Sequence, residues 1–137
     1  MKNYYSELKI LLEKSYSPYS NFPVAAIIVF NDNQIYKGVN VENAAYPSGL
    51  CAERSALFGA VANTNLKVGE VKEVHVISKN NEPVSPCLGC RQVMTEFMKP
   101  DSKIYLYSYD GKIVNEYSLK ELAPHPVVMN DIAWAKK

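Results

Sequence analysis

The sequence lacks the features that mark a membrane, secreted or polynucleotide-binding protein. No window approaches the roughly 18 consecutive apolar residues of a membrane span, and the opening MKNYYSELKI is too polar for the core of a secretory signal. Like charges do not form runs, and 15 Lys and Arg balance 14 Asp and Glu to a formal net charge of +1. We therefore expect no basic surface for nucleic acid or membrane, and a cytoplasmic location.

Cysteine and histidine are also scarce. The chain has three cysteines, an odd number that makes a poor disulfide framework where no export signal is present. Kept reduced, three thiols suit a metal site or a nucleophile instead. The two histidines lack the spacing of metal ligands, because His75 lies inside an apolar strand and His125 lies between two prolines.

What remains is a chain of 137 residues, 47% of them apolar, which is long enough for one domain with a real core, so residues 1–137 are expected to form a single domain. No repeat, linker or low-complexity tract interrupts it. Both faces of the strand at 103–109 are apolar or aromatic, which predicts a sheet covered on both sides and a three-layer α/β/α sandwich. Periodicity and turn residues predict helices over 4–16, 51–62, 86–99 and 118–121, and strands over 24–30, 34–43, 71–78, 103–109 and 112–117.

All three cysteines lie where helices are predicted to begin. Cys51 opens one helix, while Ser85 as N-cap and Pro86 at the first helical position place Cys87 and Cys90 in the first turn of another. Residues three apart on a helix share a face, so these two thiols can point at one ion. A helix start carries unpaired N–H groups and a partial positive charge, which favour the thiolate that binds metal.

Three thiolates without a fourth protein ligand predict a catalytic zinc site, because structural zinc sites normally close with four ligands. The open position takes a water, and Glu53, two residues after Cys51, is close enough in sequence to take its proton. Arg54 would offset the negative charge that three thiolates leave on a divalent ion. We therefore interpret Cys51 as a metal ligand, Glu53 as the proton shuttle and Arg54 as the group that balances the charge of the thiolates.

Alternatives from other classes stay open at this point. The pair Cys87 and Cys90 could be a redox dithiol of the thioredoxin kind, in which a C-x-x-C also opens a helix after a strand, but Cys51 and Glu53 then have no role. A non-catalytic, structural metal site would lack its fourth ligand. A polynucleotide editor would share the zinc chemistry, yet the near-neutral charge gives it no support.

Two longer segments, NVENAAYPSGLCAERSAL and SPCLGCRQV, resemble the cytidine deaminases of the small, three-cysteine, homotetrameric type. The segment YSPYSNFPVAA resembles the stretch that precedes the first strand of that family. A Cys or His ligand, a nearby Glu that does not bind the metal and a later Pro-Cys-x-x-Cys are the general signature of zinc deaminases. The resemblance implies a mixed five-stranded sheet, a homotetramer, and one Zn²⁺ per subunit held by Cys51, Cys87 and Cys90, with Arg54 hydrogen-bonded to the thiolates.

The same resemblance implies an enzyme of pyrimidine salvage, a hydrolase that converts free cytidine and deoxycytidine to uridine and deoxyuridine with release of ammonia. Glu53 would deliver protons to the ring nitrogen and to the departing amine. A related aminopyrimidine nucleoside such as blasticidin S is an alternative substrate for the same chemistry. The positions that match the family's substrate contacts are Asn40 and Glu42 for the ribose, Phe22 for the face of the base, and the backbone around Ala52 for its edge.

The C-terminal segment departs from the family's pattern. Family members often carry a Phe after Leu-Leu-Pro that reaches the pyrimidine of the neighbouring subunit, whereas this chain reads ELAPHPVV, with Val127 near the expected ring. Valine offers far less flat surface than phenylalanine. Trp134, seven residues further on, is the candidate for the missing ring.

Overall fold

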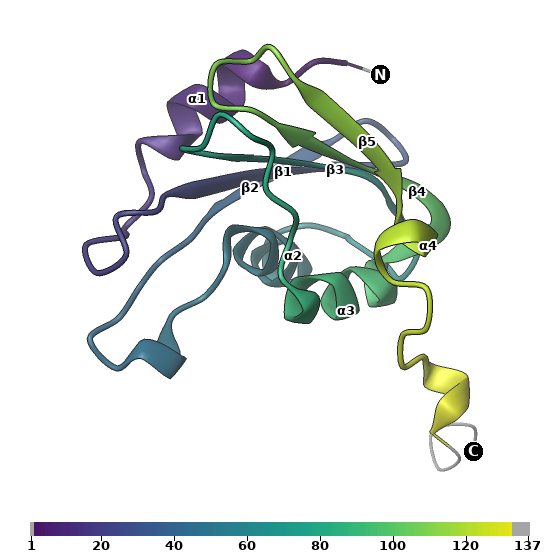
Figure 1. The fold of residues 1–137 in the computed structure, drawn as a ribbon. Helices are drawn as coiled ribbons and strands as arrows, with labels where there is room; N and C mark the ends of the chain where they lie inside the picture. The colour runs from purple at the N-terminus through teal and green to yellow at the C-terminus, as the bar shows by residue number, and fades with distance from the viewer. Residues whose placement is uncertain (1, 133–137) are drawn as a thin grey trace.

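The computed structural model describes residues 2–132, and it shows a five-stranded sheet with helices on both faces (Figure 1). The strands lie in the order β2-β1-β3-β4-β5; β3 and β4 are parallel, and the other neighbours are antiparallel. The predicted three-layer α/β/α architecture with a mixed sheet is therefore confirmed. The elements are α1 (Tyr5–Leu12), β1 (Val24–Phe30), β2 (Ile35–Val39), η1 (Tyr46–Ser48), α2 (Ala52–Asn63), β3 (Val71–Ser78), α3 (Leu88–Phe97), β4 (Met98–Tyr107), β5 (Val114–Ser118), α4 (Leu119–Leu122) and η2 (Met129–Asp131).

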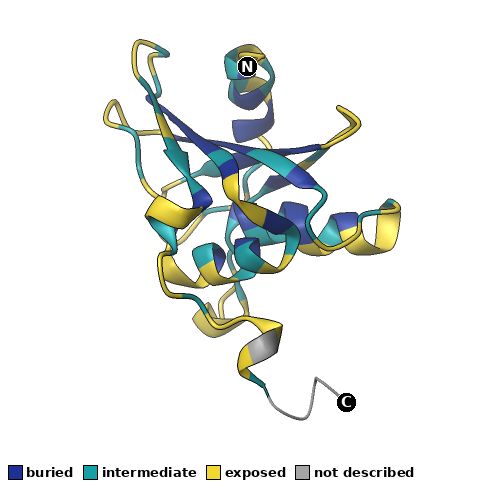
Figure 2. Ribbon diagram, turned by 90° about the vertical axis from the view of Figure 1, so that its right-hand side faces the viewer, coloured by how far each residue is buried: buried dark blue, intermediate teal, exposed yellow. Residues whose placement is uncertain are grey.

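Helix α1 covers one face of the sheet, and α2 and α3 cover the other (Figure 1). Along β1, alternate side chains belong to different cores: Ala25 and Ile27 pack under α1, whereas Ala26 and Ile28 pack against α2 and α3. Because both faces are covered, this strand is a continuous apolar run. Figure 2 shows the result, with buried strands in the middle and an exposed C-terminal segment. Within the described residues, none of the helices has the length and apolar character that crossing a membrane requires.

A glycine in β2 determines how closely α2 can lie on the sheet. A Cβ atom at Gly38 would be 2.4 Å from the backbone nitrogen of Ala56 and 2.6 Å from the carbonyl oxygen of Ala52. Such distances are well inside van der Waals contact, so only glycine allows this approach. The close packing fixes the first turn of α2, which carries the predicted catalytic carboxylate, against the sheet.

Two predicted helix boundaries are wrong. Helix α1 ends at Leu12 instead of Tyr16, because the Tyr16 backbone forms a β-bridge with Val41, donating to the Asn40 carbonyl at 3.1 Å. Helix α3 begins at Leu88, and its N-cap is Cys87, not Ser85. The Cys87 Sγ accepts a hydrogen bond from the Cys90 backbone at 3.4 Å, so a ligand thiol takes the place of a capping hydroxyl.

The boundaries of three strands also differ from the prediction. Strand β4 begins at Met98, which pairs with Val71 before an irregularity in the parallel register, and it ends at Tyr107. Strand β2 ends at Val39, and β5 occupies 114–118, about two residues later than predicted. The capping box that opens α4 is confirmed, because the Ser118 side chain and the Glu121 side chain each bond the other residue's backbone N–H.

Candidate active site

The three cysteines come together at the starts of two helices. Cys51 is the N-cap of α2, Cys87 is the N-cap of α3, and Cys90 lies in the first turn of α3. Their Sγ atoms all lie within 4.8 Å of one another, and those of Cys51 and Cys87 are 3.7 Å apart. Tetrahedral zinc with Zn–S bonds of about 2.3 Å places its sulfur ligands roughly 3.8 Å apart, so the donor set fits this metal in both chemistry and spacing.

A guanidinium stabilises the thiolate form at this cluster. The Arg54 Nη2 donates to the Cys51 Sγ at 3.4 Å, and the guanidinium lies beside Gly89 at the start of α3. The pKa of Cys51 is lowered to about 5, first by a hydrogen bond from the Cys90 thiol and further by Arg54. The pKa of Cys90 is raised in turn by its hydrogen bond to Cys51 and by burial. The Cys51 thiol is thus charged ahead of the Cys90 thiol.

Glu53 is a buried carboxylate beside the thiols. It is the second residue of α2 and is 4% exposed, and burial raises its pKa to about 7. A carboxyl group that titrates near neutral pH can both accept and deliver a proton under working conditions. Its position and its pKa both fit the role of proton shuttle.

A cavity of about 290 Å³ joins Glu53 and two of the thiols to all four predicted substrate contacts. Two of the nine predicted site residues are not part of its lining: Cys90, the third thiol of the cluster, and Arg54, which contacts Cys51. The predicted residues that line the cavity are Phe22, Asn40, Glu42, Cys51, Ala52, Glu53 and Cys87.

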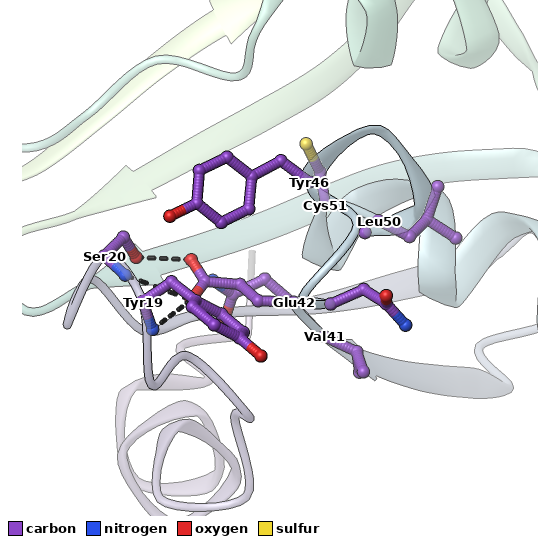
Figure 3. A pocket seen from close by; sticks show the side chains of 10 residues that line it. Tyr19, Ser20, Val41, Glu42, Tyr46, Leu50 and Cys51 are labelled. Carbon is purple, nitrogen blue, oxygen red and sulfur yellow. Dashed lines mark hydrogen bonds between the residues drawn. The ribbon is translucent and has the colours of Figure 1, made fainter.

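A larger cavity of about 420 Å³ adjoins this one and shares Asn40, Glu42 and Cys51 with it. Figure 3 shows Glu42 at its centre, with hydrogen bonds to the 19–20 backbone, and the Tyr46 ring on the far side. The rings of Tyr19 and Tyr46 meet edge to face, with centroids 5.6 Å apart. The thiol end of the site therefore opens into an aromatic outer chamber that carries one carboxylate.

The two residues matched to a ribose contact are also used by the fold. The Asn40 side chain accepts from the Val24 backbone at 2.8 Å and donates to the Phe22 carbonyl at 2.9 Å. Glu42 accepts from the backbone of Tyr19 at 2.9 Å and from the Ser20 backbone and hydroxyl, and the hydroxyl bond lowers its pKa. Both side chains are fixed in orientation before any ligand arrives.

Several residues escape prediction from the sequence or lie elsewhere. Ser20 and Ser78 line the inner cavity, although a serine in a turn or at a strand end has no distinguishing signal. His75 lies buried under α1, on the face of the sheet opposite the thiols, where its ring meets that of Tyr4. Val127 is held by Gln92, which donates to its carbonyl at 2.8 Å and accepts from its N–H at 3.1 Å. Trp134 lies outside the described residues.

Comparison with known proteins places these features in a family. Residues 1–107 match the family model described as the cytidine and deoxycytidylate deaminase zinc-binding region. A cytidine deaminase from Sporosarcina psychrophila is 39% identical over 130 residues, which cover 95% of this chain and 93% of that protein. A crystal structure of cytidine deaminase from Burkholderia pseudomallei is 39% identical, has a TM-score of 0.85, and is covered completely by 93% of this chain. A cytidine deaminase structure from Mycobacterium leprae, 33% identical, has a TM-score of 0.73, over 88% of this chain and 94% of that one.

Proposed function

Since this chain belongs to the cytidine and deoxycytidylate deaminase family, we propose that it is the enzyme that deaminates free cytidine and deoxycytidine. The products are uridine or deoxyuridine and ammonia, and the reaction is a step of pyrimidine salvage. The observation that carries the proposal is the buried Glu53, whose carboxyl lines one cavity together with the Cys51 and Cys87 thiols. A dithiol or structural metal site would have no use for that carboxyl.

In this mechanism the protein's own groups bind, orient and move protons. Cys51, Cys87 and Cys90 would hold one Zn²⁺, which supplies Lewis-acid activation of the attacking water. Glu53 takes one proton of that water and delivers it to the ring nitrogen, and then takes the second proton of the same water and delivers it to the departing amine. Arg54 keeps the thiolates charged through its contact with Cys51. Its positive charge offsets theirs.

We assign the substrate's orientation from the chemistry of the groups that line the inner cavity. The thiols and Glu53 mark the end that receives the amino-bearing edge of the ring. Phe22 lies on the wall where the face of the base packs, and the backbone at Ala52 meets the base edge. Asn40 and Glu42, at the junction with the outer chamber, then receive the ribose hydroxyls.

The charge of the outer chamber favours a nucleoside over a nucleotide. Among the described residues, the lining of the two cavities contains no Lys or Arg, and its exposed charge at the junction is the Glu42 carboxylate. A phosphate on the sugar would meet that carboxylate without a cation to balance it. We therefore assign cytidine and deoxycytidine as substrates in preference to deoxycytidylate.

The experiment is the ultraviolet absorbance change of cytidine with purified, zinc-loaded protein, because loss of the 4-amino group alters the chromophore directly. Glu53→Gln keeps the size of the side chain and is expected to keep the zinc while lowering kcat by about 100-fold to 10,000-fold. Deoxycytidylate and blasticidin S are assayed in parallel. The proposal would be overturned if zinc-loaded protein left cytidine and deoxycytidine unchanged. If it converted blasticidin S alone, the reaction would be the same and the substrate would be that aminopyrimidine nucleoside.

Assembly and location are part of the proposal. We infer a homotetramer, because a monomer would leave apolar side chains in water both at the outer chamber, where Tyr46 is 74% exposed, and beside α3, where Val127 is 60% exposed. Light scattering is expected to give about four times the chain mass of 15.4 kDa. A cytoplasmic location suits the three free thiols, which a reducing compartment keeps available for metal.

A further inference from the structure

Among the residues that the structure describes, one buried hydroxyl is without a partner. Ser78, the last residue of β3, is 2% exposed, and its Oγ makes no hydrogen bond to any residue between 2 and 132. The other buried serines behave differently: Ser108 Oγ bonds Asp110 at 2.7 Å, and Ser102 Oγ bonds the Val71 carbonyl at 3.2 Å. Buried polar groups in native proteins are nearly always hydrogen-bonded, so an unpartnered one calls for a specific explanation.

The strand geometry directs Ser78 into the candidate active site. Side chains two apart on a strand share a face, and Val74 and Val76 on this face belong to the core beneath α2 and α3. Ser78 continues the row and, with Val76, lines the inner cavity. Its partner across the sheet is Val24, which lines the same cavity. The row of apolar side chains on this face of β3 therefore ends in the Ser78 hydroxyl, at the point where the strand reaches the pocket.

The hydroxyl belongs to the base end of that cavity. Glu53 and Cys87 line it too, and the loop that leaves Ser78 leads directly to Cys87, whereas Asn40 and Glu42 stand at the junction with the outer chamber. The polar edge of a cytosine ring carries hydrogen-bond acceptors and a donor amine. A serine hydroxyl can pair with either kind of group.

We propose that Ser78 is a specificity-determining residue of this pocket, whose hydroxyl hydrogen-bonds the polar edge of the bound pyrimidine. The inference rests on the proposed deaminase function and names a contact that holds the base. It explains why the hydroxyl stays unpaired in the protein alone, because its partner arrives with the substrate. A site built around such a group discriminates against rings that cannot pair with it.

The test compares two buried serines, Ser78→Ala and Ser108→Ala. For Ser78→Ala, kcat/KM is expected to fall about threefold to tenfold, the worth of one hydrogen bond, and to fall equally for cytidine and deoxycytidine. Its melting temperature without substrate stays the same or rises, because no bond is lost. Ser108→Ala is expected to do the reverse, with a lower melting temperature from the lost bond to Asp110 and an unchanged kcat/KM.

Two results would overturn the inference while the proposed function stands. The first is an unchanged kcat/KM in Ser78→Ala, whether or not the melting temperature falls. The second is a fall for cytidine alone, which would put the contact on the ribose 2′-hydroxyl. Uridine binding to the unaltered protein, measured by calorimetry, separates the two failures. If that protein neither converts cytidine nor binds uridine, the deaminase proposal fails and the role of Ser78 fails with it.

Discussion

Two clusters of buried polar groups, one around His75 under α1 and one around the thiols and Ser78 under α2 and α3, differ in how complete their hydrogen bonds are. Under α1, His75 is fully buried and both ring nitrogens have partners, Tyr107 Oη at 2.8 Å and Glu73 Oε1 at 3.0 Å. Under α2 and α3, the Arg54 Nε and the Ser78 Oγ have no partner within residues 2–132, and on α1 the Glu7 Oε2 likewise has none. Buried groups whose hydrogen bonds are complete stabilise a fold, whereas incomplete ones are left for a metal or a substrate to complete.

The surroundings of His75 under α1 show what is needed to complete the hydrogen bonds of a buried imidazole. The Tyr4 backbone N–H donates to the Tyr107 hydroxyl at 3.2 Å, so the hydroxyl is free to donate to Nδ1 of His75. The Nε2–H then donates to Glu73, and every polar atom of the neutral imidazole is used. The ring also stacks on Tyr105 with centroids 4.8 Å apart. Such a group is expected to matter for stability and not for turnover.

The largest effect expected on the α2 and α3 face comes from removing a thiol. Cys87 is exposed, so Cys87→Ala removes one proposed metal ligand and little packing. The variant is expected to lose stoichiometric zinc, and loss of Lewis-acid catalysis worth several kcal/mol lowers kcat on the order of 1,000-fold. Elemental analysis measures the zinc content, and the cytidine assay measures kcat. Full zinc occupancy with full activity would show that Cys87 is not a ligand.

A smaller effect on the same face is expected from the guanidinium that contacts the thiolates. Arg54→Gln removes the Nη2 contact to Cys51 and should weaken zinc affinity about 10-fold to 100-fold, as loss of a ligand's hydrogen-bond partner typically does. Arg91 is the matched control, because it bonds only the carbonyls of Pro86 and Leu122. Competition with a chelator measures the affinity. Equal losses in Arg54→Gln and Arg91→Gln would reduce Arg54 to a structural role.

The contrast also explains what the sequence could reveal. The metal cluster could be predicted, because residue types with specific chemistry stand at helix starts, where spacing fixes their common face. Ser78 and the paired state of His75 could not, since a serine or histidine in a strand has no signal of its own. Their roles follow from the register that sets Val24 against Ser78 and His75 against Tyr105, which is a tertiary property.

The predicted helix boundaries are wrong where contacts between distant parts of the chain outweigh the local sequence pattern. The apolar spacing that suggests a helix as far as Tyr16 continues past Leu12, but the Tyr16 backbone pairs with the segment after β2. Ser85 and Pro86 carry the usual signs of a helix start, yet the helix begins at Leu88, where a thiol serves as the cap. Local propensity is a weak prior that tertiary contacts routinely override.

On the α1 face, the expected effect is on stability alone. His75→Phe keeps the stacked ring but removes both hydrogen bonds and leaves the Tyr107 hydroxyl without its acceptor, at a cost of about 1–3 kcal/mol. Urea unfolding measures the loss, and kcat/KM for cytidine should not change. If the variant had normal stability and impaired turnover, the prediction that His75 acts on stability alone would be wrong.

The smallest expected effect is the pH dependence that His75 adds to stability. Burial lowers the His75 pKa, and this outweighs the neighbouring Glu73, so the unfolded chain binds the proton more readily than the native protein does. The contribution is complete above the unfolded-state pKa of about 6.5 and is lost as the pH falls through the native value. Its slope is at most about 1.4 kcal/mol per pH unit, the limit for one proton.

To isolate that slope, both proteins are unfolded in the Cys87→Ala background, where release of metal by acid does not contribute. Between about pH 7.5 and 5.5, around the ordinary histidine pKa, the chain with His75 should lose more stability than His75→Phe does. The carboxylates with lowered pKa values, Asp110 and Glu121, and the buried Glu53 are common to both proteins and cancel. If the stability of the two proteins had the same pH dependence, Glu73 would compensate the burial of the imidazolium, and the His75 site would tolerate a positive charge.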